Sequence, residues 1–195
     1  MFQFFRMVMG ALAGISLGIA VPALAQQDVP NPPDPYVHAQ TGAAFPAKAG
    51  PWSRTRVTEY QDGGIDISAG YALRNHPRMV VVTLYVYPRY ESCDAEFAAT
   101  LEPIDEYTDR RLGVDRGDER FAPFGDTEQR LARFSVPPGA YGFDHPRLIT
   151  DAWLACPAGE EWLVKMRASY EAAEDEALIR RLIERLDWSS LVPAE

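Results

Sequence analysis

The chain has three histidines, the side chains best suited to acid–base chemistry or metal binding near neutral pH. His38 lies in a proline-rich stretch and His76 precedes a proline in a turn, so we expect both to be solvated loop residues. Only His145 has carboxylates nearby in the sequence, Asp144 and Asp151, and their spacing is irregular. Metal-ligand spacings such as H-x-x-x-H or E-x-x-H are absent from the sequence. The sequence therefore predicts no metal site, and His145 is a speculative ligand-binding residue.

Nucleophilic catalysis needs a serine, threonine or cysteine beside a base. The match to the G-x-S-x-G nucleophile elbow at residues 14–18 lies inside an apolar leader, whereas a working elbow joins a strand to a helix. The glycine loop that cradles phosphates and the dinucleotide fingerprint are also missing from the sequence. We therefore predict no catalytic residue, no cofactor and no enzymatic activity, and a hydrolase is the least favoured alternative.

Aromatic side chains offer another route to a ligand. Tyr85 and Tyr87 belong to an apolar run, and Tyr141 and Phe143 precede His145 in a later loop. Such residues are most often core or cross-strand pairs. The alternative is an aromatic groove, for which we take Tyr85, Tyr141 and His145 as the speculative ligand-binding residues.

The first 25 residues have the composition of a signal peptide. A lone Arg6 precedes an uncharged apolar run at residues 7–20, and the small residues of Ala23-Leu24-Ala25 predict cleavage after Ala25. The alternative is an uncleaved anchor, but the run is shorter than the roughly 20 apolar residues that span a bilayer. We therefore expect a periplasmic or secreted protein with no stable membrane span after cleavage.

Cys93 and Cys156 are the two cysteines of the chain. An oxidising compartment favours their pairing, which closes a loop of about 60 residues and stabilises the fold by about 4 kcal/mol. Two buried free thiols or a redox pair are the alternatives, and the lack of a C-x-x-C motif disfavours the redox pair.

The charge balance limits the choice of partners. The formal net charge is −9, and the basic residues, 17 arginines and two lysines, are scattered along the chain. Nucleic acid and anionic membranes require a concentrated basic face. We therefore exclude nucleic acid as a partner and leave an unknown protein partner open.

Two regions follow the leader. Residues 26–51 carry six prolines without apolar periodicity, which predicts a disordered tether. Residues 52–192 are predicted to form a single domain. Its expected elements are a hairpin (54–60 and 65–73), a strand (79–87), a helix that begins after Ser92 and stops at Gly113, a strand (129–136), a loop (137–146), a second hairpin (147–156 and 161–170) and a final helix (174–186).

Side-chain patterns predict how these elements are buried. Residues 79–87 are apolar on both faces, as in a central strand that is covered on both sides. In the last strand, Lys165 and Arg167 face away from the apolar side chains. The first helix contains Pro103, which predicts either a kink or a second helix that starts there.

Three segments carry a resemblance to a known group. They are LYVYP at residues 84–88, EF at 96–97 and WLVKMRASY at 162–170, followed by a terminal helix. In this order they resemble small exported proteins of the PsbP-like group, over residues 45–192. The resemblance implies helices flanking a central antiparallel sheet and a non-catalytic accessory or assembly role, with no catalytic residues to carry over.

The sequence thus predicts an α+β fold, a central antiparallel sheet of about six strands flanked by helices. The leading functional hypothesis is a periplasmic accessory or protein-interaction domain without catalytic activity. The alternative is a periplasmic small-molecule or metal-binding protein that uses an aromatic groove near His145. A pocket ringed by Tyr85, Tyr141 and His145 would favour the binding protein, whereas a filled core with an exposed apolar patch would favour the interaction domain.

Overall fold

The computed structural model describes residues 26–61, 63–106, 108, 110–114, 121–157 and 161–192. The predicted signal peptide and its cleavage site after Ala25 lie outside the described residues. The elements, in chain order, are β1 (Gln27–Asp28), β2 (Tyr36–Val37), β3 (Ala44–Phe45), β4 (Lys48–Ala49), β5 (Trp52–Glu59), β6 (Ile67–Leu73), β7 (Val80–Pro88), α1 (Cys93–Asp105), β8 (Arg110–Val114), β9 (Glu128–Val136), β10 (Leu148–Cys156), β11 (Trp162–Tyr170) and α2 (Glu176–Arg185), with 3-10 turns at Ala122–Phe124 and Ala173–Asp175.

The fold is mostly one antiparallel sheet with two helices, as the predicted α+β class requires. Nine of the strands form the sheet, in the order β1-β5-β6-β7-β11-β10-β9-β8, and β4 also pairs with β5. All six predicted strands are present, as β5, β6, β7, β9, β10 and β11. The prediction of about six strands was too low, because β1, β4 and β8 extend the sheet at its edges. Strands β2 and β3 pair separately.

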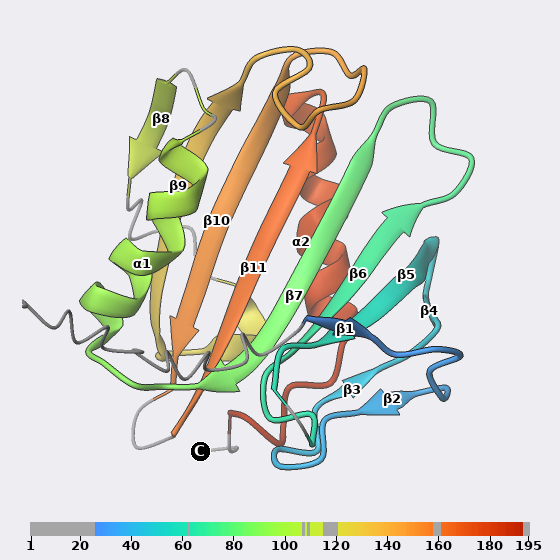
Figure 1. The fold of residues 1–195 in the computed structure, drawn as a ribbon, viewed down its shortest axis with the longest axis vertical. Helices are drawn as coiled ribbons and strands as arrows, with labels where there is room; N and C mark the ends of the chain where they lie inside the picture. The colour runs from blue at the N-terminus through green and yellow to red at the C-terminus, as the bar shows by residue number, and fades with distance from the viewer. Residues whose placement is uncertain are drawn as a thin grey trace, which may run out of the picture.

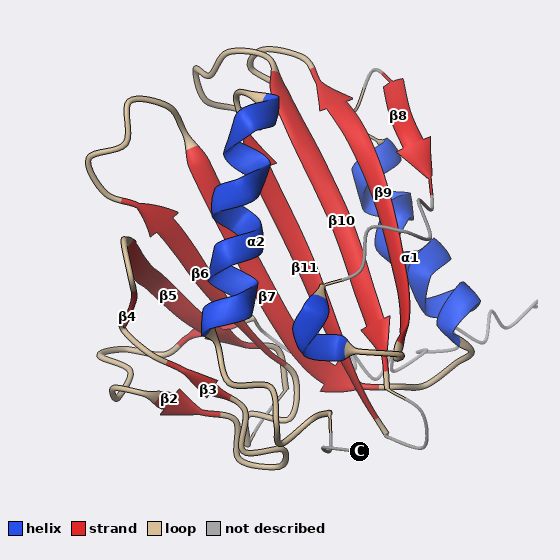
Figure 2. Ribbon diagram, turned by 180° about the vertical axis from the view of Figure 1, so that it is seen from behind, coloured by secondary structure: helices blue, strands red, loops and turns tan. Residues whose placement is uncertain are grey.

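The two helices lie on opposite faces of the sheet (Figures 1 and 2). Helix α2 buries the apolar stripe predicted for it, with Ile179, Leu182 and Ile183 at most 1% exposed. Burial of each such side chain contributes about 1.5–3 kcal/mol. This face carries the larger core, which also takes in Trp153 and Trp188.

Helix α1 covers a smaller core over β9 and β10, built around Phe97, Leu101 and Phe134. Ser92 caps the helix as predicted, because its side chain accepts a hydrogen bond from the Ala95 N–H group at 3.3 Å. The start of α1 is joined to the end of β10 by the predicted disulfide between Cys93 and Cys156, whose Cα atoms are 6.0 Å apart.

The end of α1 differs from the prediction. A single helix ends at Asp105, with Pro103 in its last turn, and Arg110 and Arg111 belong to the edge strand β8. Pro103 has no N–H group to donate to the Ala99 carbonyl, so the last turn of the helix is weakened, and the chain beyond it pairs with β9 as β8.

The predicted disordered tether at residues 26–51 is wrong. Phe45 is 1% exposed and joins the larger core, and β1 and β4 pair with β5. The Arg54 guanidinium holds the proline-rich part, because it donates hydrogen bonds to the backbone carbonyls of Pro32 at 3.2 Å and Pro33 at 2.7 Å and also to that of Phe45. Two-residue strands are too short to produce a periodic pattern, so the sequence signal for order was absent.

Candidate functional site

Among the described residues, no helix covers one half of one face of the sheet. Figure 1 shows α1 in front of β9 and β10, whereas β11, β7, β6 and β5 have no helix in front of them. On β7, Val82 and Leu84 point into the larger core, and the alternate residues Val81, Thr83 and Tyr85 face the uncovered side. The prediction that this strand is covered on both sides is therefore wrong, since Val81 is 37% exposed.

This uncovered half contains a groove of about 300 Å³, which we call the arginine groove. Arg56 of β5 and Arg167 of β11 lie on it, with Thr83 of β7 between their strands. Its upper end is formed by Tyr141 from the loop between β9 and β10, which arches over this end of the sheet (Figure 1). The volume is at the lower end of the range of small-molecule sites.

Glycine at position 70 makes room for the arginine groove. Gly70 of β6 pairs with Thr83, in the middle of the uncovered half. A Cβ atom at this position would lie 2.9 Å from the Thr55 hydroxyl oxygen and 3.3 Å from the Arg56 Cγ atom. Because Gly70 has no side chain, the side chain of Arg56 can lie close to β6 at this position.

The charges of the arginine groove are of one sign. Arg56 and Arg167 line it, and none of the described residues that line it is acidic. The side chain of Arg56 forms no hydrogen bond or ion pair with any described residue. In a chain of net charge −9, two arginines on one open surface favour an anionic ligand.

The aromatic side chains at the Tyr141 end of the arginine groove form a cluster of three rings with His145. The Tyr141 ring lies 6.1 Å from the Phe143 ring and 5.1 Å from the His145 ring, measured between centroids. The Arg167 guanidinium carbon lies 5.5 Å from the centroid of Tyr141. Phe143 is 53% exposed, so it offers an apolar surface to a ligand at the mouth of the groove.

Hydroxyl groups fix the position of Tyr141. Its phenol oxygen lies 2.8 Å from the Thr150 hydroxyl and 3.1 Å from the Ser169 hydroxyl, and these two are 2.8 Å apart. Thr150 and Ser169 are paired residues of β10 and β11, so the sheet register sets this triangle. The loop is thereby anchored to the wall of the arginine groove.

Tyr85 forms the other aromatic part of the arginine groove. Burial raises the pKa of its phenol to about 12, and the neighbouring Tyr60 adds to the rise. The phenol is therefore neutral near pH 7 and can donate a hydrogen bond to an anion.

His145 supports the arginine groove from behind. Its Nδ1 atom lies 2.6 Å from the Pro146 carbonyl oxygen, and its Nε2 atom accepts from the Tyr141 backbone N–H at 3.3 Å. Both ring nitrogens therefore have hydrogen-bond partners within the loop, and neither points to a metal site. The structure thus brings Tyr85 and Tyr141 together in one groove and places His145 behind Tyr141.

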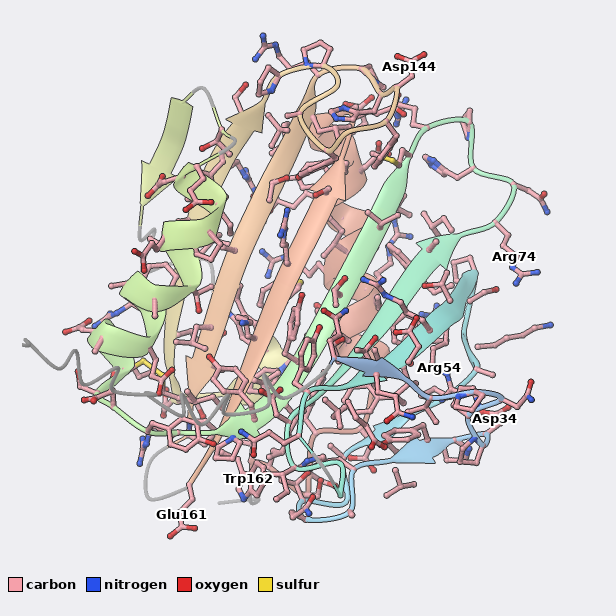
Figure 3. The ribbon with its side chains drawn as sticks, in the orientation of Figure 1. Asp34, Arg54, Arg74, Asp144, Glu161 and Trp162 are labelled. Atoms are coloured by element: carbon pink, nitrogen blue, oxygen red, sulfur yellow. A yellow bond between two sulfur atoms is a disulfide. The ribbon has the colours of Figure 1, made fainter. Side chains whose placement is uncertain are left out.

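The carboxylates near His145 do not join it. Asp144 is exposed at the loop tip, where Figure 3 shows it pointing outward. Asp151 faces the opposite side of the sheet and binds Arg133. Among the described residues no group of three or more histidine, cysteine, aspartate or glutamate side chains could hold a metal ion.

The prediction that His38 is a solvated loop residue is wrong, since it is fully buried. Its Nδ1 atom lies 2.7 Å from the Thr41 hydroxyl, and its Nε2 atom lies 3.2 Å from the Ile65 carbonyl. The ring also contacts Trp162 edge to face, with centroids 4.9 Å apart. His38 therefore has a structural role, because it fixes residues 36–45 to the rest of the fold.

Comparisons of the chain with protein-family models, with curated proteins and with solved structures find no match. The resemblance to the PsbP-like group therefore stays a prediction. Within the described part of the chain, no helix has the length and apolar character needed to cross a membrane.

Proposed function

We propose that the protein binds small organic anions that carry an aromatic or apolar portion. The observation that carries the proposal is the arginine groove, in which Arg56 and Arg167 lie beside aromatic rings with no acidic side chain among its described lining residues. Charged hydrogen bonds from the arginines and from the neutral Tyr85 phenol would hold the anionic group. The rings of Tyr141 and Phe143 would hold the apolar portion.

The proposal develops the binding-protein alternative from the sequence, and it includes export and the absence of catalysis. The predicted leader supports export, as does the disulfide, which persists in oxidising compartments. The accessory or interaction role has less support. Of the four exposed large apolar side chains in the described residues, Val81 and Phe143 belong to the arginine groove and Val37 and Tyr90 are not part of it.

A matched pair of ligands tests the proposal. Naphthoate and naphthamide have nearly the same shape, and only naphthoate is charged. Charged hydrogen bonds contribute about 1.5–3 kcal/mol, so naphthoate should bind about 10- to 100-fold more tightly in calorimetric titrations. Equal affinity for the two ligands would refute the proposal.

Arginine variants locate the site. Arg56→Met and Arg167→Met should each reduce naphthoate affinity by about ten-fold or more and leave naphthamide binding nearly unchanged. Arg74→Met is the control, since Arg74 is exposed in the turn between β6 and β7 and Figure 3 shows it pointing away from the sheet. If all three variants lost affinity equally, the anion would not bind in the arginine groove.

A further inference from the structure

A second hollow lies beside the arginine groove on the same open half of the sheet. It has a volume of about 180 Å³ and is lined by Tyr60, Asp66, Tyr85, Tyr87 and Lys165, and we call it the lysine pocket. Lys165 of β11 lies opposite Tyr85 of β7 in the register of the sheet. Tyr85 is the residue that the two hollows share.

The ammonium group of Lys165 has aromatic neighbours in place of an ion-pair partner. Its Nζ atom lies 4.4 Å from the centroid of Tyr85 and 5.0 Å from that of Tyr87. No described side chain forms a hydrogen bond or an ion pair with it. A lysine that is held in a pocket without a carboxylate in contact can lose its proton more easily than a paired one.

The surroundings lower the pKa of Lys165. Burial lowers the pKa of Lys165, and Arg167, two residues away on the same face of β11, lowers it further. Asp66 and Glu96 act in the opposite direction but do not offset the burial. An arginine at this position could not become a nucleophile, because its guanidinium stays protonated in proteins.

We propose that Lys165 captures small aldehydes in the lysine pocket as a Schiff base. The Nζ lone pair adds to the carbonyl carbon and gives a carbinolamine. The carbonyl oxygen then leaves as water with the two protons of the amine, and a C=N double bond remains. The phenols of Tyr60 and Tyr85 line the same pocket and can pass the proton to the leaving oxygen.

This activity is separate from anion binding in the arginine groove, because it requires the amine and not the two arginines. A wild-type chain that captures aldehyde and does not bind naphthoate would contradict the proposed function and leave this inference standing. A wild-type chain that binds naphthoate and captures no aldehyde would contradict this inference and leave the proposed function standing.

The chain contains its own control for the experiment. Its only lysines are Lys165 and Lys48, and Lys48 is exposed on β4. The full chain is incubated at pH 7 with benzaldehyde and cyanoborohydride, which reduces a Schiff base to a stable amine, and the label is located by peptide mass mapping. We expect Lys165 to be labelled faster than Lys48, because burial lowers the pKa of Lys165 and so raises its unprotonated fraction. Equal labelling, or faster labelling of Lys48, would overturn the proposal.

Two variants test the cause of the reactivity. Asp66→Asn removes a charge that favours the ammonium form, so labelling at Lys165 should become faster and that at Lys48 should not change. Lys165→Arg keeps the positive charge and should abolish labelling in the pocket while the melting temperature stays close to that of the wild type. An Asp66→Asn protein with unchanged or slower labelling at Lys165 would contradict the inference.

Discussion

Replacing Asp151 by alanine should lower the free energy of unfolding by about 3–5 kcal/mol, the range for breaking a buried ion pair. Asp151 is 3% exposed and lies opposite Arg133 in the register of β10 and β9. Its carboxylate accepts hydrogen bonds from Arg133 Nε at 2.6 Å and Nη2 at 2.9 Å, and another from the Tyr170 hydroxyl at 2.9 Å. The alanine variant would leave Arg133 with Glu176 as its remaining ion-pair partner among the described residues.

The assay is urea unfolding followed by circular dichroism, with the m-value as a check that the unfolded state is unchanged. For a chain of 195 residues, the predicted loss corresponds to a fall in melting temperature of roughly 6–20 °C. Glu128→Ala is the matched control, because Glu128 pairs with Arg130 at 2.6 Å on the surface and its side chain is 47% exposed. Its loss should cost less than about 1 kcal/mol.

A double variant separates the cost of a buried unpaired charge from the loss of the ion pair itself. Asp151→Leu with Arg133→Met should be less destabilised than either single variant, since no charge is then left buried without its partner. A cost for Asp151→Ala as small as that for Glu128→Ala would refute the reasoning, because it would show that solvent screens this ion pair.

Three further predictions concern other contacts that hold the fold. Cys93→Ser should lower the free energy of unfolding by up to about 4 kcal/mol, as measured in urea, and a variant as stable as the wild type would contradict a structural disulfide. The hydrogen bonds from Arg78 lower the pKa of Asp175 below its usual 3.8. The wild type should therefore lose stability as the pH falls below 3.8, and Asp175→Asn should lose less. Parallel acid-unfolding curves for the two proteins would contradict this. Arg54→Met should speed amide hydrogen exchange in residues 36–45, because the proline-rich segment loses its hydrogen bonds to the guanidinium. Unchanged exchange would show that this segment is held by other contacts.

The six long strands and α2 could be predicted because each is long enough to show its period. The alternation on β11 placed Lys165 and Arg167 on the face opposite the apolar side chains, and the structure confirms this. The final helix showed a complete apolar stripe. The short strands β1 to β4 contain two residues each, so they showed no such period. The segment that carries them is held in place by hydrogen bonds from Arg54, which is distant in sequence from Pro33.

The candidate site was predicted in part. The sequence suggested Tyr85, Tyr141 and His145 but did not suggest Arg56, because a lone arginine on a strand resembles any surface charge. Gly70 was the available signal, since a glycine inside a strand often marks a close approach of other atoms. These residues come together in space because β5, β6, β7 and β11 pair in that order, and no local sequence pattern specifies this pairing.

The most direct test of the proposed anion binding is the position of a bound ligand, mapped by amide chemical shifts during titration with naphthoate. We predict that the shifts concentrate at Arg56, Thr83, Arg167 and Tyr141, the strand and loop positions around the arginine groove. Titration with naphthamide should give much smaller shifts at the same positions. Shifts that concentrate elsewhere on the molecule, or that are equal for the two ligands, would contradict the account.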